Sequence, residues 1–118
     1  MPPLHPLTSA ADFERVRREG RSHAHPLIVL VACPHPPSAR PQPTRVGVVA
    51  GKRVGNAVAR NRAKRLMREA LRAYQTQIAS GWDLIFIGRA PLAEATLANA
   101  LMVIDNLLTR AHIKKADA

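Results

Sequence analysis

The chain has 118 residues, 47% of them hydrophobic, and a formal net charge of +10 at pH 7. Its length suits one domain with one modest core, and we expect a single domain over residues 1–118 with an ordered core at about 8–112. The lone Cys33 excludes an internal disulfide framework, and no segment resembles a secretory signal or a membrane span. These features predict a soluble, cytoplasmic protein with an anionic partner.

The first elements of the chain are marked by prolines and a capping signal. Residues 1–7 carry three prolines and are predicted to form an irregular arm. Ser9 and Asp12 lie three residues apart, as in a helix capping box, and predict a short helix over residues 12–19. Gly20 is well placed to end this helix.

Two apolar segments in the first half of the chain predict strands. Residues 27–33 (LIVLVAC) are rich in β-branched side chains and indicate a buried strand. Residues 34–43 follow with five prolines, which remove ladder donors and predict a loop. Residues 45–51 alternate between two faces of a sheet, and Gly47 and Gly51 leave room for a close approach to the backbone.

Residues 52–72 carry most of the charge, with eight basic residues and one acid, a net +7. On a wheel of roughly 100° per residue, the apolar side chains of residues 58–78 fall on one side and the basic ones on the other. Arg60 lies at the seam. Gly55 and Asn56 suit the start of this helix, because asparagine can cap the first free N–H groups.

The basic face of this helix allows several readings. Arginine outnumbers lysine there by five to one, and its planar guanidinium binds phosphate bidentately and stacks on bases, which favours a nucleic-acid surface. A solvated face, an acidic membrane or a partner groove are the alternatives. A membrane or partner would need the apolar side of residues 58–78 to be exposed, yet a protein this small needs that side for its core.

The last third of the chain predicts one strand and one helix. Residues 82–88 (WDLIFIG) read as a strand, in which Asp83 lies on the same side as Ile85. Thr96 can cap a last helix, in which leucine and isoleucine recur at helical spacing. Residues 112–118 are expected to be frayed.

The spacing of residues 52–68, Lys-x-x-Gly-Asn-Ala-Val-x-Arg-Asn-Arg-x-Lys-Arg-x-x-Arg, resembles the signature of the protein subunit of bacterial ribonuclease P. Arg60-Asn61-Arg62 is the core of that motif. The resemblance covers roughly residues 8–110, including the start around Phe13 and the strand that holds Asp83.

The resemblance also implies a fold. The order of elements indicates a small α/β (α+β) two-layer sandwich, with three helices on a small mixed sheet in the order αβ(β)βαβα. The family's fold is ribosomal protein S5 domain 2-like. Ordinarily a strand–helix–strand crossover is right-handed, whereas the resemblance implies a rare left-handed β-α-β crossover at the basic helix.

In the family that this sequence resembles, the catalyst is the RNA subunit, whose Mg²⁺ ions activate water to remove the 5′ leader of precursor tRNA. The resemblance implies partnership with this catalytic RNA and with precursor tRNA, and no obligate protein partner. The residues implied to contact RNA are Lys52, Arg53, Asn56, Arg60, Asn61, Arg62, Lys64, Arg65, Arg68 and Arg72. Alternatively, Asn61 only caps or braces the turn, and Arg60 pairs with Asp83 or another acid.

The family also holds the leader in a cleft between the first helix and the sheet. The matching positions are Phe13, Arg17, Val29 and Val31, of which only Phe13 is aromatic. Relatives can carry Phe and Tyr at the positions of Arg17 and Val31. An arginine plane can stack on a base, but valine cannot replace a ring. Leader affinity and sequence preference therefore stay open, and Phe13 suits plain core as well as leader contact.

The residues themselves offer no protein active site. The acidic residues are scattered, and no two form a pair suited to acid–base work or to a two-metal site. His23, His25 and His35 lack a carboxylate or thiolate spaced with them, so no bound metal is predicted. We expect no cofactor on the protein, with Mg²⁺ used by the RNA subunit. Without the resemblance, a ribosomal or general RNA-binding protein with no role in cleavage would fit the same residues.

Overall fold

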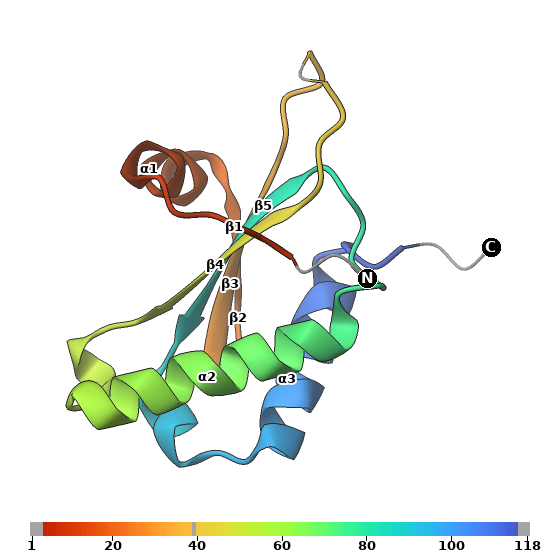
Figure 1. Cartoon of the computed structure of the whole chain (residues 1–118). Coiled ribbons are helices and arrows are strands. Elements are labelled where there is room, and N and C mark those ends of the chain that lie inside the picture. Colours follow the sequence, from red (N-terminus) through yellow and green to blue (C-terminus); the bar gives the residue numbers. More distant parts are fainter. Residues whose placement is uncertain (1–3, 39, 116–118) are drawn as a thin grey trace.

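The computed structural model describes residues 4–38 and 40–115 as a five-stranded mixed sheet with three helices (Figure 1). The strands are β1 (His5–Pro6), β2 (Arg21–Ala24), β3 (Ile28–Pro34), β4 (Arg45–Ala50) and β5 (Trp82–Gly88). The helices are α1 (Ala10–Glu19), α2 (Ala57–Tyr74) and α3 (Leu97–Arg110), with 3-10 turns η1 (Lys52–Val54) and η2 (Ala90–Glu94). The predicted α+β class, with three helices on a mixed sheet, is confirmed.

The sheet has the strand order β1-β4-β5-β3-β2. β4 runs parallel to β5, and α2 connects the two, so this segment is the predicted strand–helix–strand unit. β3 runs antiparallel to both β5 and β2. The hand of the crossover stays a prediction.

Alternation along the central strands divides the apolar side chains between two cores. Leu30, Leu84 and Phe86 face α2 and α3 and belong to the main core. Val31 and Ile85 face the other way and pack with α1 in a smaller core. As Figure 1 shows, α1 lies apart from α2 and α3, on the opposite side of the sheet.

Helix α2 begins where the sequence predicts. The side-chain oxygen of Asn56 accepts a hydrogen bond from the N–H of Ala59 at 2.9 Å. The helix buries its apolar side, namely Ala63, Leu66, Met67, Ala70 and Leu71. It ends at Tyr74, earlier than the predicted residue 78, because Ile78 instead forms an isolated bridge with Lys114. Since this side is buried, it is not available to enter a membrane or the groove of a partner. No helix of the described residues is long and apolar enough to cross a bilayer.

The N-terminal arm is more ordered than predicted. β1 pairs in parallel with the start of β4, and Leu7 is only 2% exposed. The N–H of Leu7 donates to the carbonyl of Val46 at 2.9 Å. The prediction of an irregular arm over residues 1–7 is therefore wrong for residues 5–7, because an edge strand tolerates proline. Residues 1–3 lie outside the described part.

The C-terminal segment is also held by the rest of the protein. Ile113 is fully buried, and its carbonyl accepts a hydrogen bond from the N–H of Ala79 at 2.8 Å. The N–H of Lys115 donates to Gln77 at 2.7 Å. Fraying was therefore the wrong prediction for residues 112–115, because the turn after α2 supplies a partner that the local sequence does not reveal. Residues 116–118 lie outside the described part.

Two glycines allow close packing around α1. Gly20 ends α1 in an extended conformation, and a Cβ there would lie 2.5 Å from the carbonyl oxygen of Val16. A Cβ on Gly47 would lie 2.5 Å from the ring of Phe13. The group that closely approaches the backbone of Gly47 is thus the ring of Phe13, and this contact packs α1 against the sheet.

Candidate nucleic-acid interface

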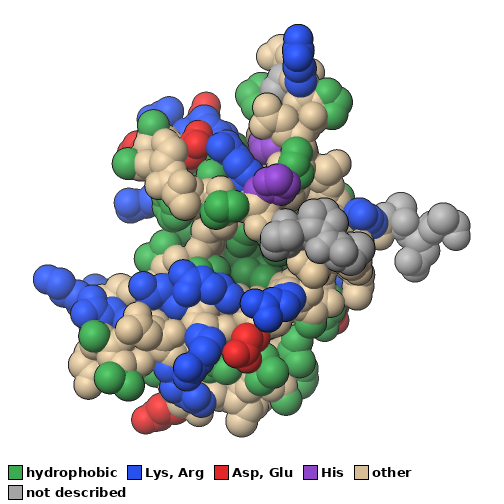
Figure 2. Space-filling model, in the orientation of Figure 1, with side chains coloured by type: hydrophobic (Ala, Val, Ile, Leu, Met, Phe, Trp, Pro, Cys, Tyr) green, Lys and Arg blue, Asp and Glu red, His purple; other side chains and the backbone are tan. Residues whose placement is uncertain are grey.

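The basic side chains of α2 form a stripe along its exposed side, visible in Figure 2. Arg65, Arg68 and Arg72 recur at helical spacing and are all exposed. Within the described part of the chain, their guanidinium groups make no hydrogen bond or ion pair. Lys52 and Arg53 on η1 are exposed as well and precede the first turn of α2. We call these five residues the open basic stripe.

The remaining predicted RNA contacts on α2 differ in their surroundings. Asn61 is exposed and Lys64 is half-buried. The start of the helix is capped by Asn56, so Asn61 is not the cap. Arg60 is half-buried, and its Nε is buried without a hydrogen-bond partner among the described residues. Pairing between Arg60 and Asp83 is a wrong prediction, because Asp83 lies on the α1 side of the sheet.

Arg62 makes two hydrogen bonds inside the protein. Its Nε donates to the carbonyl of Ala93 at 2.7 Å, and its Nη2 donates to the carbonyl of Ala95 at 2.9 Å. These bonds tie α2 to the segment that leads from η2 into α3. Sequence reasoning assigned Arg62 to RNA and missed this role, because its partners are carbonyls that no side-chain pattern marks.

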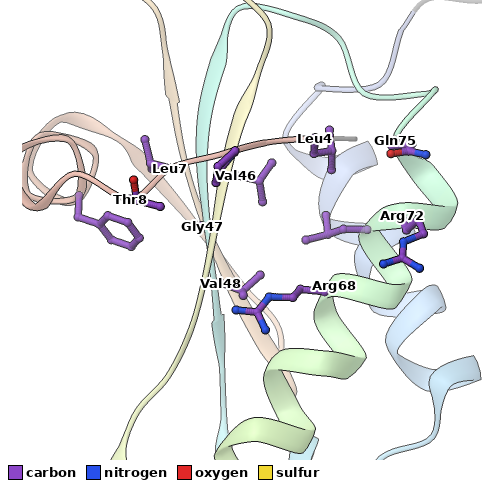
Figure 3. A pocket seen from close by; sticks show the side chains of 12 residues that line it. Leu4, Leu7, Thr8, Val46, Gly47, Val48, Arg68, Arg72 and Gln75 are labelled. Carbon is purple, nitrogen blue, oxygen red and sulfur yellow. The ribbon is translucent and has the colours of Figure 1, made fainter. Parts of the chain in front are cut away.

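A cleft of about 370 Å³ lies beside the stripe (Figure 3). Val48 on β4 and Leu71 on α2 supply apolar surface, and Phe13 and the N-terminal arm contribute from the α1 side. Arg68 and Arg72 also line the cleft. Figure 2 shows this region as a hollow with an apolar floor, bordered by basic side chains. The stripe and an apolar cleft are therefore continuous.

The four residues predicted to hold a leader do not all meet in this cleft. Phe13 lines it and is half-buried. Arg17 is exposed on α1, Val29 is half-buried on β3, and Val31 is 6% exposed beneath α1. The structure thus brings Phe13 to the same cleft as Arg68, while Val31 contributes to the smaller core.

A buried ionic cluster holds α1 in place, and sequence reasoning missed it. Asp83 on β5 is fully buried, and its carboxylate accepts hydrogen bonds from Arg45 at 2.8 and 2.9 Å. Arg15 of α1 also donates to it, and Nε2 of His35 lies 3.0 Å away. Arg45 additionally contacts Asp12 of α1 at 3.0 Å. The cluster therefore links α1, β4, β5 and the proline-rich loop.

The electrostatics of Asp83 follow from these contacts. Burial on its own raises the pKa of a carboxyl group. The hydrogen bonds from Arg45, His35 and Arg15 outweigh burial and lower the pKa of Asp83 to about 2. The carboxylate is charged at neutral pH and fully engaged. A signal was present in the sequence: an acid in an otherwise apolar strand needs a basic partner, and Arg45 begins the neighbouring strand.

Two of the histidines singled out in the sequence have hydrogen-bond partners within the fold. No group of three His, Cys, Asp or Glu side chains in residues 4–38 and 40–115 could hold a metal ion. His35 is engaged with Asp83, and Nδ1 of His25 accepts from the N–H of Leu27 at 3.1 Å.

Comparisons with known proteins agree with one another. The family model described as ribonuclease P matches residues 1–112. A ribonuclease P protein component from Herpetosiphon aurantiacus is 44% identical over 91% of this chain and 84% of its own length. One from Bacillus cereus is 32% identical over 94% of each protein.

Solved structures show the same likeness. The Staphylococcus aureus RNase P protein superposes with a TM-score of 0.81 at 28% identity, covering 94% of this chain and 98% of that one. The Thermotoga maritima RNase P protein superposes with a TM-score of 0.76 at 27% identity, covering 90% of this chain and 96% of that one.

Proposed function

Because the chain belongs to the ribonuclease P protein family, we propose that it binds the catalytic RNA and the 5′ leader of precursor tRNA, and so promotes removal of that leader. The enzyme is a ribonucleoprotein that cleaves tRNA precursors, and this chain is its protein component. We further propose that it works in the cytoplasm and that the RNA subunit, with Mg²⁺, supplies the catalytic groups.

The observation that carries the proposal is the open basic stripe beside an apolar cleft. Arg65, Arg68 and Arg72 are exposed, and no acid of the described residues engages them. Such guanidinium groups bind phosphates and release the counterions condensed on RNA. The cleft offers Phe13 and apolar surface to a single strand, as expected for a leader held by stacking.

The acids near the cleft support placing the catalytic groups in the RNA. Asp12 and Asp83 are both held in ion pairs with Arg45. No acidic residue lines the cleft in the part of the chain that the structure describes. The protein therefore contributes by neutralising phosphates, orienting the RNA and holding the leader, rather than by moving protons.

The test is cleavage of a precursor tRNA by a bacterial ribonuclease P RNA at low Mg²⁺, with and without the protein. We expect the wild type to restore cleavage, Arg65→Ala/Arg68→Ala to lose this effect, and protein alone to cut nothing. Arg21→Ala/Arg40→Ala removes the same charge from exposed arginines away from α2, and it should behave as wild type.

Two outcomes would contradict the proposal. If the wild type binds RNA but leaves cleavage unchanged, the chain acts as a general RNA-binding protein. If protein alone cleaves, the catalytic groups lie in this chain.

A further inference from the structure

We propose that the cleft between β4 and α2 holds one unstacked nucleotide of single-stranded RNA. The main chain of Val48 hydrogen-bonds the edge of the base, and Arg68 and Arg72 hold the phosphate. This inference rests on the proposed function, because it takes RNA as the partner. It adds a defined nucleotide site at an open strand edge.

The outer edge of β4 is largely uncovered in the described part of the chain. β1 pairs only with Arg45 and Val46, and the N–H of Leu7 donates to the carbonyl of Val46 at 2.9 Å. The main-chain groups of a strand alternate between its two edges, so Val48 and Ala50 turn theirs to the same side as Val46. No strand of the described residues covers that side beyond Val46. These N–H and C=O groups are free to bind a ligand.

The cleft suits a nucleobase in its size and in its lining. The volume of about 370 Å³ falls within the usual range for ligand sites, roughly 300–1,000 Å³. A base has two apolar faces and a polar edge. Val48 and Leu71 offer apolar surface, Phe13 offers a ring, and the main chain of Val48 supplies the polar edge. Stacking on an aromatic side chain is the usual way in which proteins hold a base of a single strand.

The cleft also carries positive charge on its α2 side. Arg68 and Arg72 lie four residues apart on α2 and both line the cleft, as Figure 3 shows. No acidic residue lines the cleft in the described part of the chain. Two arginines beside an apolar slot favour an anionic ligand over the neutral main chain of a peptide that adds to the edge. Thr8 and Gln75 at the rim supply further hydrogen-bonding groups.

The direct test removes the outward N–H of β4 at one position. Val48→Pro deletes this donor without breaking a ladder bond, because proline is tolerated where the N–H faces away from the neighbouring strand. Ala50→Pro makes the same change on the same edge but outside the cleft. Binding of the full-length protein to a labelled single-stranded RNA hexanucleotide should weaken about 5-fold for Val48→Pro. Ala50→Pro should stay within about twofold of the wild type.

A second variant keeps the test decisive if Val48→Pro does not fold. Thr8→Trp places a large side chain at the exposed rim of the cleft and should block the hexanucleotide. Thr109→Trp, on the exposed surface of α3, is its control. The proposal is overturned if Thr8→Trp and Thr109→Trp bind the hexanucleotide equally well. It is also overturned if an extended uncharged peptide displaces the RNA from the wild type but not from Thr8→Trp.

The nucleotide can come from the leader or from the RNA subunit, and the ribonucleoprotein distinguishes these sources. If it comes from the leader, Val48→Pro raises KM for a precursor with a long leader but not for one with a single-nucleotide leader. If it comes from the RNA subunit, assembly weakens and both precursors suffer. If Val48→Pro is silent throughout while Arg65→Ala/Arg68→Ala loses cleavage, the nucleotide site is wrong and the proposed function stands.

Discussion

Two groups of arginines in this protein have opposite surroundings. Arg15 and Arg45 point at the buried carboxylate of Asp83, while Arg65, Arg68 and Arg72 extend from α2 without an acidic partner in the described chain. The first group joins α1 to the sheet, and the second presents charge to an external anion. Arginine alone therefore does not indicate function; the partner available within the fold decides it.

The two groups of arginines also depend on each other. Asp83 and its arginines fix α1 on the sheet, and α1 carries Phe13 to the edge of the cleft. The open basic stripe supplies the opposite wall through Arg68 and Arg72. Changes in the buried group should act on stability first, and changes in the open stripe on RNA binding first.

The largest effect is expected when the buried group loses its acid. Asp83→Asn removes the buried counter-charge of Arg15 and Arg45 and leaves them only the partly exposed Asp12. Breaking a buried ion pair by removing one partner costs roughly 3–5 kcal/mol, so urea unfolding should show a loss of that size. Asp105→Asn, which breaks the partly exposed pair with Lys114, should cost at most about 1 kcal/mol. Equal losses in both variants would contradict the assigned role of Asp83.

The same group predicts a pH dependence. The pKa of Asp83 is lowered from 3.8 to about 2 in the folded protein, so its stabilisation is fully present above pH 4. It is lost as the pH falls from about 4 through 2, because protons then bind the unfolded chain more readily. The shift corresponds to a loss on the order of 2 kcal/mol. Unfolding experiments should show this extra acid sensitivity in the wild type and not in Asp83→Asn.

A substitution in the open basic stripe should weaken RNA binding and leave stability almost unchanged. Arg68→Ala removes an exposed side chain that has no polar partner among the described residues, so the free energy of unfolding should change by less than about 0.5 kcal/mol. RNA affinity should fall about 10-fold, and the slope of log K against log salt should shrink by about one. Titration of the catalytic RNA at several salt concentrations measures both. A loss of stability equal to the loss of binding would show that Arg68 belongs with the buried group.

Features that depend on neighbours in sequence could be predicted. The cap at Asn56, the buried side of α2 and the alternation of β4 and β5 all follow from local spacing. The features that were missed join distant parts of the chain. Arg45 and Asp83 are 38 residues apart, and Arg62 reaches a carbonyl 31 residues away. Local patterns indicate which side chains are polar, but the partner of each is fixed only when the strands pair.

Arg62 tests the boundary between the two groups, because its position in the sequence suggests the open stripe while its contacts are internal. Arg62→Ala removes two hydrogen bonds to Ala93 and Ala95 at a largely exposed site, so we expect a loss of about 1 kcal/mol in stability. Arg65→Ala removes the same charge three residues away and should leave stability unchanged while weakening RNA binding more. Measuring unfolding and RNA affinity for both variants separates the roles. Arg62→Ala could instead weaken RNA binding as strongly as Arg65→Ala and leave stability intact. In that case Arg62 exchanges its carbonyl partners for phosphate when RNA binds, and the sequence-based assignment of Arg62 to RNA contact is correct.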